Sequence, residues 1–239
     1  MHYFVDDHET PMRTTPLFMA AATGQAAVIA VLLKAGAKII RTTTGGLTPL
    51  FVSAQQGHRA AVSVLVRAGA EIDIVTDDQC TPLLIAALEG HEAVLAVLIQ
   101  AGGDVHRTGG NGCSPVVMAV QNDHRAVLAM LVKSGADINQ ARDNGFTPLF
   151  LAAYKKNKTV LAMLLEAGAD ANFARDTYGC TPLFIAAHHG YEEVLVALLE
   201  AGAQMTATDN GRTPLMAATS GGHTSVVEAL RRWTAGIRN

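Results

Sequence analysis

Apolar and polar positions follow a pattern that recurs seven times along the chain. Each unit opens with Thr or Ser before Pro and continues with a short apolar run, as in "PLFLAA" at 148–153. After a polar stretch, a second apolar run has helical spacing, as in "EAVLAVLIQ" at 92–100, and leads in most units to "AGA" or "SGA". This spacing predicts two short helices per unit, joined by a turn.

Units of nearly constant length fill most of the chain. The Thr or Ser before Pro recurs at intervals of 33, 33, 33, 33, 34 and 32 residues, at Thr15, Thr48, Thr81, Ser114, Thr147, Thr181 and Thr213. A period of this size predicts a repeat protein in which each unit packs against its neighbours.

The polar residues of each unit carry signals that begin and end its helices. Thr and Ser are favoured N-caps, and Pro is favoured at the first helical position. Gly at 24, 57, 90, 190 and 222 is expected to end the first helix, and Gly at 36, 69, 102, 135, 168 and 202 fits a left-handed cap after the second. Asp, Asn and Gly between the units predict an outward polar turn.

The motifs Thr-Pro-Leu, Ala-Ala, Gly-His, paired Leu and Gly-Ala recur in phase over roughly residues 10–234, and this signature resembles the ankyrin-repeat family. The resemblance implies an all-α solenoid of helix-turn-helix pairs with β-hairpin loops. We expect an N-terminal segment at 1–11, seven repeats within 12–234 and a C-terminal tail at 235–239. The repeats are expected at 12–42, 43–75, 76–108, 109–141, 142–174, 175–207 and 208–234.

One position departs from the family pattern throughout. The His that usually follows Thr-Pro-Leu is replaced by Phe18, Phe51, Leu84, Val117, Phe150, Phe184 and Met216. We therefore expect apolar packing in place of the inter-repeat hydrogen bonds that this His makes in the family.

Composition narrows the class of protein. The 239 residues carry a formal net charge of −3, which gives no basic field for a nucleic-acid backbone. Three cysteines are an odd number and favour a reducing compartment over a disulfide framework. The start lacks the features of a signal peptide, and the apolar run at 26–33 is too short to span a bilayer. We expect a cytoplasmic protein, with the nucleus as an alternative location.

Residues that suggest chemistry recur in phase with the repeat. His58, His91, His124 and His223 share one repeat position, where neighbours lie about 10 Å apart, whereas zinc ligands lie about 2.3 Å from one ion. Cys80, Cys113 and Cys180 also share one position, and "GGNG" at 109–112 lacks the ending of a phosphate loop. We therefore predict no catalytic residue, metal or cofactor, and place enzymes third among the functions.

The polar half of each unit varies between repeats, and the resemblance implies that partners dock there, on hairpin tips and on the exposed end of the first helix. Aromatic residues and Arg dominate interface energetics. The predicted partner-binding residues are Leu88, Glu89, Phe146, Tyr154, Lys155, Tyr178, His188, His189 and Arg212. The alternative is that these side chains decorate the surface or fill gaps between repeats.

The resemblance also implies a modification site. The Asn that follows Gly-Ala-Asp and one further residue is matched by Asn139 in "GADINQA" and Asn172 in "GADANFA". Hydroxylation by an asparaginyl hydroxylase is the functional interpretation, and stabilisation of the hairpin turn is the structural one.

Two functions are consistent with these features of the sequence. The first is a protein-binding module, a monomer when isolated, that recognises one or more proteins on its concave face. The second is a permanent structural or accessory subunit of a larger assembly. Apolar patches outside the concave face would favour the second.

The ends of a solenoid need polar outer faces. Arg231 follows Leu230 where earlier repeats have a second apolar residue, which predicts a terminal repeat. Met19 and Val28 keep interior apolar identities at the other end, so we predict that Tyr3, Phe4 and Val5 fold back over them. The alternative is that this end is a second docking surface.

Overall fold

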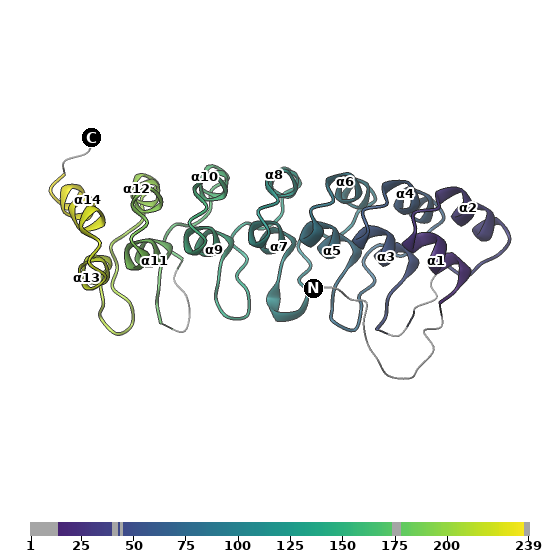
Figure 1. The fold of residues 1–239 in the computed structure, drawn as a ribbon, viewed down its shortest axis with the longest axis horizontal. Coiled ribbons are helices and arrows are strands. Elements are labelled where there is room, and N and C mark those ends of the chain that lie inside the picture. Colours follow the sequence, from purple (N-terminus) through teal and green to yellow (C-terminus); the bar gives the residue numbers. More distant parts are fainter. Residues whose placement is uncertain (1–13, 40–42, 44, 174–177, 237–239) are drawn as a thin grey trace.

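The computed structural model describes residues 14–39, 43, 45–173 and 178–236, which form seven helix pairs stacked in a row (Figure 1). The first helices of the pairs are α1 (Pro16–Ala22), α3 (Pro49–Gln55), α5 (Pro82–Glu89), α7 (Pro115–Gln121), α9 (Pro148–Tyr154), α11 (Pro182–His189) and α13 (Pro214–Ser220). The second helices are α2 (Ala26–Lys34), α4 (Arg59–Arg67), α6 (Glu92–Gln100), α8 (Arg125–Lys133), α10 (Lys158–Glu166), α12 (Glu192–Glu200) and α14 (Thr224–Thr234). The predicted all-α repeat architecture is confirmed.

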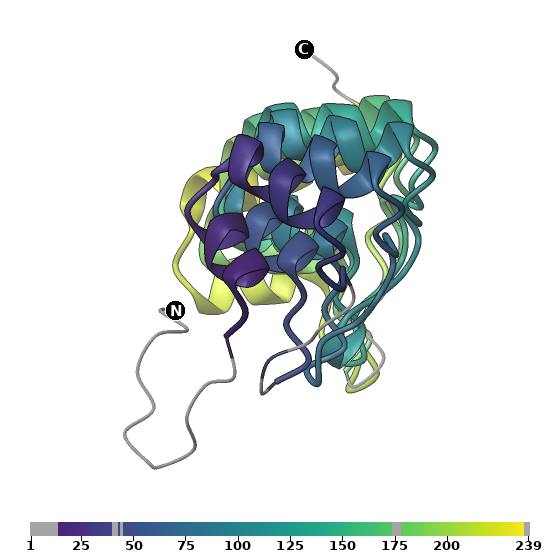
Figure 2. The same cartoon turned by 90° about the vertical axis from the view of Figure 1, so that its right-hand side faces the viewer.

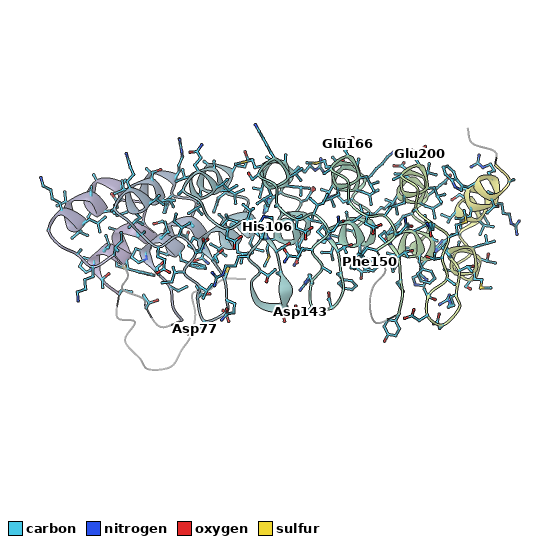
Figure 3. All side chains as sticks on the ribbon, turned by 180° about the vertical axis from the view of Figure 1, so that it is seen from behind. Asp77, His106, Asp143, Phe150, Glu166 and Glu200 are labelled. Atoms are coloured by element: carbon cyan, nitrogen blue, oxygen red, sulfur yellow. The ribbon has the colours of Figure 1, made fainter. Side chains whose placement is uncertain are left out.

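The helices form two layers. The first helices lie side by side in one layer, the second helices form the other, and the connecting loops project beyond the first-helix layer (Figures 1 and 2). Side chains seen from behind follow the same division: Asp77 and Asp143 lie at loop tips, whereas Glu166 and Glu200 lie on the second-helix layer (Figure 3).

Each first helix begins as its sequence predicts. Thr81 is extended, and its hydroxyl accepts a hydrogen bond of 3.1 Å from the backbone N–H of Leu84. All seven Thr or Ser caps make this bond, and Pro occupies the first turn of every first helix. A cap of this kind stabilises a helix by about 1 kcal/mol.

The core lies between the two layers and continues from repeat to repeat. Leu83, Leu95 and Leu98 of the third repeat have no exposed surface. The position after Thr-Pro-Leu is buried in the first six repeats, with Phe51 at 5% and Phe184 at 6% exposure. Apolar packing therefore occupies this position, as predicted.

The connecting loops turn tightly. The backbone N–H groups of Thr76, Arg142 and Thr208 donate to the carbonyl groups four residues later, at 2.9 to 3.0 Å. Neighbouring loops are also linked, since the N–H of Asp143 donates to the carbonyl of Asn111 at 3.2 Å. "GGNG" forms a short 3₁₀ turn, Gly110–Gly112. Among the described residues no strand forms, so the hairpin character of these loops is confined to their turns.

The two ends of the row differ. At the first repeat, Met19, Val28 and Val31 are 51%, 46% and 67% exposed, because the repeat that would cover them is missing from the described chain. At the last described repeat Arg231 is exposed, and Met216 is 54% exposed. The predicted cover, Tyr3 to Val5, lies outside the described residues.

Candidate binding surface

Histidines link most neighbouring repeats through one kind of hydrogen bond. The Nε2 atom lies 2.9 to 3.1 Å from a carbonyl oxygen near the end of the preceding first helix, and a protonated Nε2 donates to it. The pairs are His58 with Ala22, His91 with Gln55, His124 with Leu88 and His223 with His188. These contacts give the four histidines a structural role between repeats.

This histidine requires glycine in the repeat before it. Gly57 has a φ of +74°, and a Cβ at this position would lie 2.8 Å from the ring of His91. At Gly90 the same Cβ would lie 2.5 Å from His124. The left-handed backbone and the ring together favour glycine, so the Gly and the His of adjacent repeats depend on one another.

The junction between the fourth and fifth repeats breaks this rule. Asp123 replaces the glycine at a φ of +57°, and Asn157 replaces the histidine. The Nδ2 of Asn157 donates to Asp123 at 2.7 Å, and Arg125 pairs with the same carboxylate at 3.0 Å. Hydrogen bonds from Arg125 and Asn157 lower the pKa of Asp123. The Nζ of Lys155 donates to the carbonyl of Gln121 at 2.7 Å, where a histidine binds at other junctions.

The junction between the fifth and sixth repeats breaks the rule differently. Lys156 replaces the glycine at a φ of +56°, and Tyr191 replaces the histidine. The Nζ of Lys156 lies 5.4 Å from the centroid of the Tyr191 ring, within the range of a cation–π contact. A lysine chain therefore lies against an aromatic ring where other junctions have a carbonyl–imidazole bond.

Four rings meet beside this junction, at the ends of α9 and α11. Tyr154 lies edge-on to His189 at 5.6 Å between centroids, and His189 stacks on Tyr191 at 5.4 Å. His188 lies 5.0 Å from His189. We call Tyr154, His188, His189 and Tyr191 the aromatic cluster. Tyr154 is 54% exposed and both histidines are exposed, so the cluster forms part of the surface.

Comparison with known proteins identifies the family. The family model for ankyrin repeats (3 copies) matches residues 2–76, 60–142, 83–175, 118–209 and 149–238. The chain belongs to the ankyrin-repeat family. Ankyrin-repeat domains are generally protein–protein interaction modules.

Two solved ankyrin-repeat domains are similar over most of the chain. The ankyrin repeat domain of Bcl-3, described as a unique member of the IkappaB protein family, is 23% identical with a TM-score of 0.85, covering 92% of this chain and 100% of that one. The human ASB11 ankyrin repeat domain is 27% identical with a TM-score of 0.77, covering 91% and 97%. No curated protein matches in sequence.

The ankyrin stack brings together only some of the predicted partner-binding residues. Tyr154, His188 and His189 meet in the aromatic cluster, and Lys155 adjoins it but is bound to a carbonyl. Lys156 and Tyr191 were not among the predicted residues. The sequence signal that marks them is the loss of the recurring Gly and His at these two positions. This signal can be interpreted only once the steric contact between the Gly of one repeat and the His of the next is known.

The other predicted residues lie elsewhere. Phe146 is half-buried and stacks on Phe150 at 4.7 Å, near the base of its loop. Tyr178 and Arg212 are exposed on loops, and Tyr178 is separated from the aromatic cluster by the length of α11, about 12 Å for eight residues. Leu88 and Glu89 end α5, two repeats away from α9.

The two candidate hydroxylation residues bridge ankyrin repeats. The Oδ1 of Asn139 accepts a hydrogen bond from the N–H of Asp170 at 2.8 Å, and that of Asn172 accepts from Gln204 at 2.7 Å. Asp73 makes the equivalent contact with the N–H of Asp104 at 3.1 Å. This position therefore supports the loops between repeats, whatever modification it carries.

Cys80 and Cys113 form no disulfide, and both have a raised pKa, which lowers the fraction of reactive thiolate. Burial, followed by the nearby Asp78 charge, raises the pKa of Cys80 to about 12. Burial also raises the pKa of Cys113, against the opposing effect of Arg142. Within the described chain, His, Cys, Asp and Glu side chains form no group of three that could hold a metal ion. None of the described helices is both long and apolar enough to cross a membrane.

Proposed function

We propose that this ankyrin-repeat chain is a non-catalytic binding module, whose protein partner docks on the concave face formed by the loop tips and the exposed ends of the first helices. The partner crosses the fifth to seventh repeats. A cytoplasmic or nuclear location is part of the proposal.

The observation that carries the proposal is the exposed aromatic cluster. Aromatic rings are the side chains that most often dominate binding energy when a partner covers them. Here Tyr154 and Tyr178 are each more than half exposed, although only 5% of the residues are aromatic. Both lie in the variable half of the unit, outside the apolar framework that builds the stack.

Four of the nine histidines and the Cys80 thiol are committed to structural contacts. The inter-repeat histidines contact carbonyl groups, and burial keeps the Cys80 thiol protonated near neutral pH. These assignments support a binding role rather than a catalytic one.

The test is the double variant Tyr154→Ala/Tyr178→Ala. Proteins bound by the wild-type chain are captured from its native source, identified by mass spectrometry and then titrated against both chains in pure form. Removing the two rings should weaken binding of the specific partner by about 2 kcal/mol or more, because truncation of hot-spot aromatic residues commonly costs this much binding free energy. The melting temperature should change little, since both side chains are exposed.

A matched control is Glu166→Ala/Glu200→Ala, which removes two exposed side chains from the second-helix layer (Figure 3). This control should keep the partner's affinity. If the dissociation constant is the same for the tyrosine variant and the wild type, the assignment of the binding face is wrong.

One observation favours the alternative, a permanent subunit of a larger assembly. Met19, Val28 and Val31 expose apolar surface at the first repeat, and the same repeat carries an open pocket of about 340 Å³ lined by residues including Leu17 and Leu32. Light scattering coupled to size-exclusion chromatography distinguishes the two functions. A stable monomer at all concentrations favours the binding module, whereas self-association or aggregation of the pure chain favours the subunit.

A further inference from the structure

The junction between the fifth and sixth repeats departs, at a cost in backbone strain, from the Gly–His rule that four other junctions follow. A non-glycine residue in the left-handed region is strained and persists only when its surroundings hold it there. Glycine occupies this position in repeats one, two, three, six and seven, all with positive φ, whereas Asp123 occupies it in the fourth and Lys156 in the fifth. The Asp123 carboxylate gains hydrogen bonds from Arg125 and Asn157. Local rules that a chain breaks without an evident structural gain are concentrated at functional sites.

The replacement places a cation beside exposed rings. Lys156 lies over Tyr191, which stacks on His189, which in turn contacts Tyr154. The result is an exposed surface of rings with a lysine chain along one edge, spanning two repeats. Glycine and histidine at these positions would build the junction equally well, as they do between the sixth and seventh repeats.

The charges around the cluster are unbalanced. Arg125 is paired with Asp123 at 3.0 Å, and Lys158 with Glu193 at 3.4 Å. Within the described chain, Lys155 and Lys156 have no carboxylate partner, although both are exposed. Glu192 lies in the first turn of α12, directly after Tyr191, and is the carboxylate next to the cluster in sequence that has no ion pair among the residues that the structure describes.

Resting on the proposed function, we propose that this surface binds an acidic segment of the partner protein that also carries an aromatic side chain. The segment's carboxylates meet Lys155 and Lys156, and its ring packs against Tyr154 and the adjacent histidines. Opposite charges across an interface give specificity and speed association more than they raise affinity. A partner bound through phosphates is disfavoured by the net charge of −3.

The probe is a fluorescein-labelled peptide composed of Asp, Glu and Phe, titrated into the full chain by fluorescence anisotropy. Three comparison probes are the same peptide with Lys for each acid, the same peptide with Ala for each Phe, and a single-stranded oligothymidylate. We expect saturable binding of the first peptide, weaker binding when Phe is replaced, and none by the basic peptide. Added salt should weaken binding of the acidic peptide, because salt screens exposed charges.

The decisive variant is Lys156→Gly, which removes the cation and supplies the residue that the backbone favours. It should raise the melting temperature and lower the affinity for the acidic peptide about tenfold, the loss typical of an important interface side chain. Lys156→Arg should retain binding because it keeps the cation. Gln79→Gly makes the same kind of backbone change at a φ of +60°, on an exposed loop of the third repeat, and should leave the dissociation constant unchanged. A purely structural role for Lys156 would not separate stability from binding in this way.

Several outcomes overturn the inference. These are equal binding of the basic peptide or the oligothymidylate, no saturable binding of the acidic peptide, and an unchanged affinity in Lys156→Gly. Each leaves the proposed function to be decided separately by the Tyr154→Ala/Tyr178→Ala titration with the captured protein. Loss of captured protein in that titration, together with no peptide binding, would mean that the face is right and the acidic partner wrong.

Discussion

At the residue scale, one steric conflict explains why two positions in different repeats change together. A Cβ in place of Gly90 would lie 2.5 Å from the ring of His124, so a side chain there and a histidine opposite exclude one another. Where the chain has Asp123 or Lys156 at this position, the opposing residue is Asn157 or Tyr191. The sequence change at one repeat is thus a packing consequence of the change in its neighbour.

This conflict predicts a non-additive double-mutant cycle. Tyr191→His alone should destabilise the chain by about 1 to 3 kcal/mol, because an imidazole placed as at the Gly–His junctions would overlap the Cβ of Lys156 and the stacking of Tyr191 on His189 would be lost. Combined with Lys156→Gly, the same substitution should be neutral or stabilising, since it recreates the Gly–His junction found between other repeats. Denaturant unfolding of the four proteins measures the coupling energy. Simple additivity would contradict the steric account.

A second prediction concerns pH and His189. Partial burial, followed by the charges of His188 and His223, lowers the pKa of His189. The folded chain therefore binds fewer protons than the unfolded chain, and the contribution of His189 to stability is present above the ordinary histidine pKa and lost as the pH falls toward the lowered value. Between about pH 7 and about pH 5, wild type should lose more stability than His189→Gln. Parallel pH profiles for the two proteins would contradict this assignment.

A third prediction concerns the modification of Asn139 and Asn172. Hydroxylation would add one oxygen atom to each of these two side chains. Their Oδ1 atoms already accept inter-repeat hydrogen bonds. Intact-mass analysis of protein from its native source should reveal species heavier by one oxygen. If only the unmodified mass is found, the two residues serve the loops alone. Asn139→Ala should in either case cost about 1 kcal/mol through the lost bond.

At the scale of elements, the helix pairs share their buried residues and differ in the residues of their turns. The seven first helices share a cap, a starting Pro and a buried apolar side, which explains why they form alike. The turns after α9 and α11 carry the residues that distinguish them, including Lys156 and Tyr191. Because those turns contribute little to the core, they can change without loss of the stack.

The inter-repeat histidines lead to a prediction at this scale. His124→Ala removes the contact of 2.9 Å between the turn before α8 and the end of α5. We expect a loss of about 1 kcal/mol in unfolding free energy, the net contribution of one such hydrogen bond. Amide exchange should increase at the junction of the third and fourth repeats more than at either end. Uniform changes along the whole stack would argue against a local link.

At the scale of the whole molecule, the stack is quasi-one-dimensional, and its ends are exposed surfaces. Each repeat contacts its neighbours, so the first repeat lacks half of the packing that covers interior ones. Val52, the interior equivalent of Met19, is 1% exposed, whereas Met19 is 51% exposed. This difference is the reason to expect a cover over the first repeat.

Deletion of residues 1–10 tests that expectation. If Tyr3, Phe4 and Val5 cover the first repeat, the shortened chain should melt earlier or self-associate, because apolar surface becomes exposed to water. Thermal unfolding and light scattering measure the two effects. An unchanged monomer of equal stability would show that this segment is not a cap.

The sequence by itself determined the repeat, its helices, their caps and the buried apolar positions. Each of these features depends on residues that lie close together in the chain. Thr81 caps the helix that begins at the next residue, and Leu83, Leu95 and Leu98 are buried as their helical spacing predicts. Local hydrogen bonding and periodicity need no knowledge of the neighbouring repeat.

The aromatic cluster was decided by the tertiary structure. Lys155, a predicted partner-binding residue, donates a hydrogen bond to the carbonyl of Gln121, 34 residues earlier, and no local pattern predicts this contact. Lys156 and Tyr191 were not predicted, although they form the edge of the aromatic cluster with His189. Such contacts depend on how closely one repeat packs against the next and on which turns of the two repeats face each other. That spacing is set by packing along the whole stack, so no single repeat contains it.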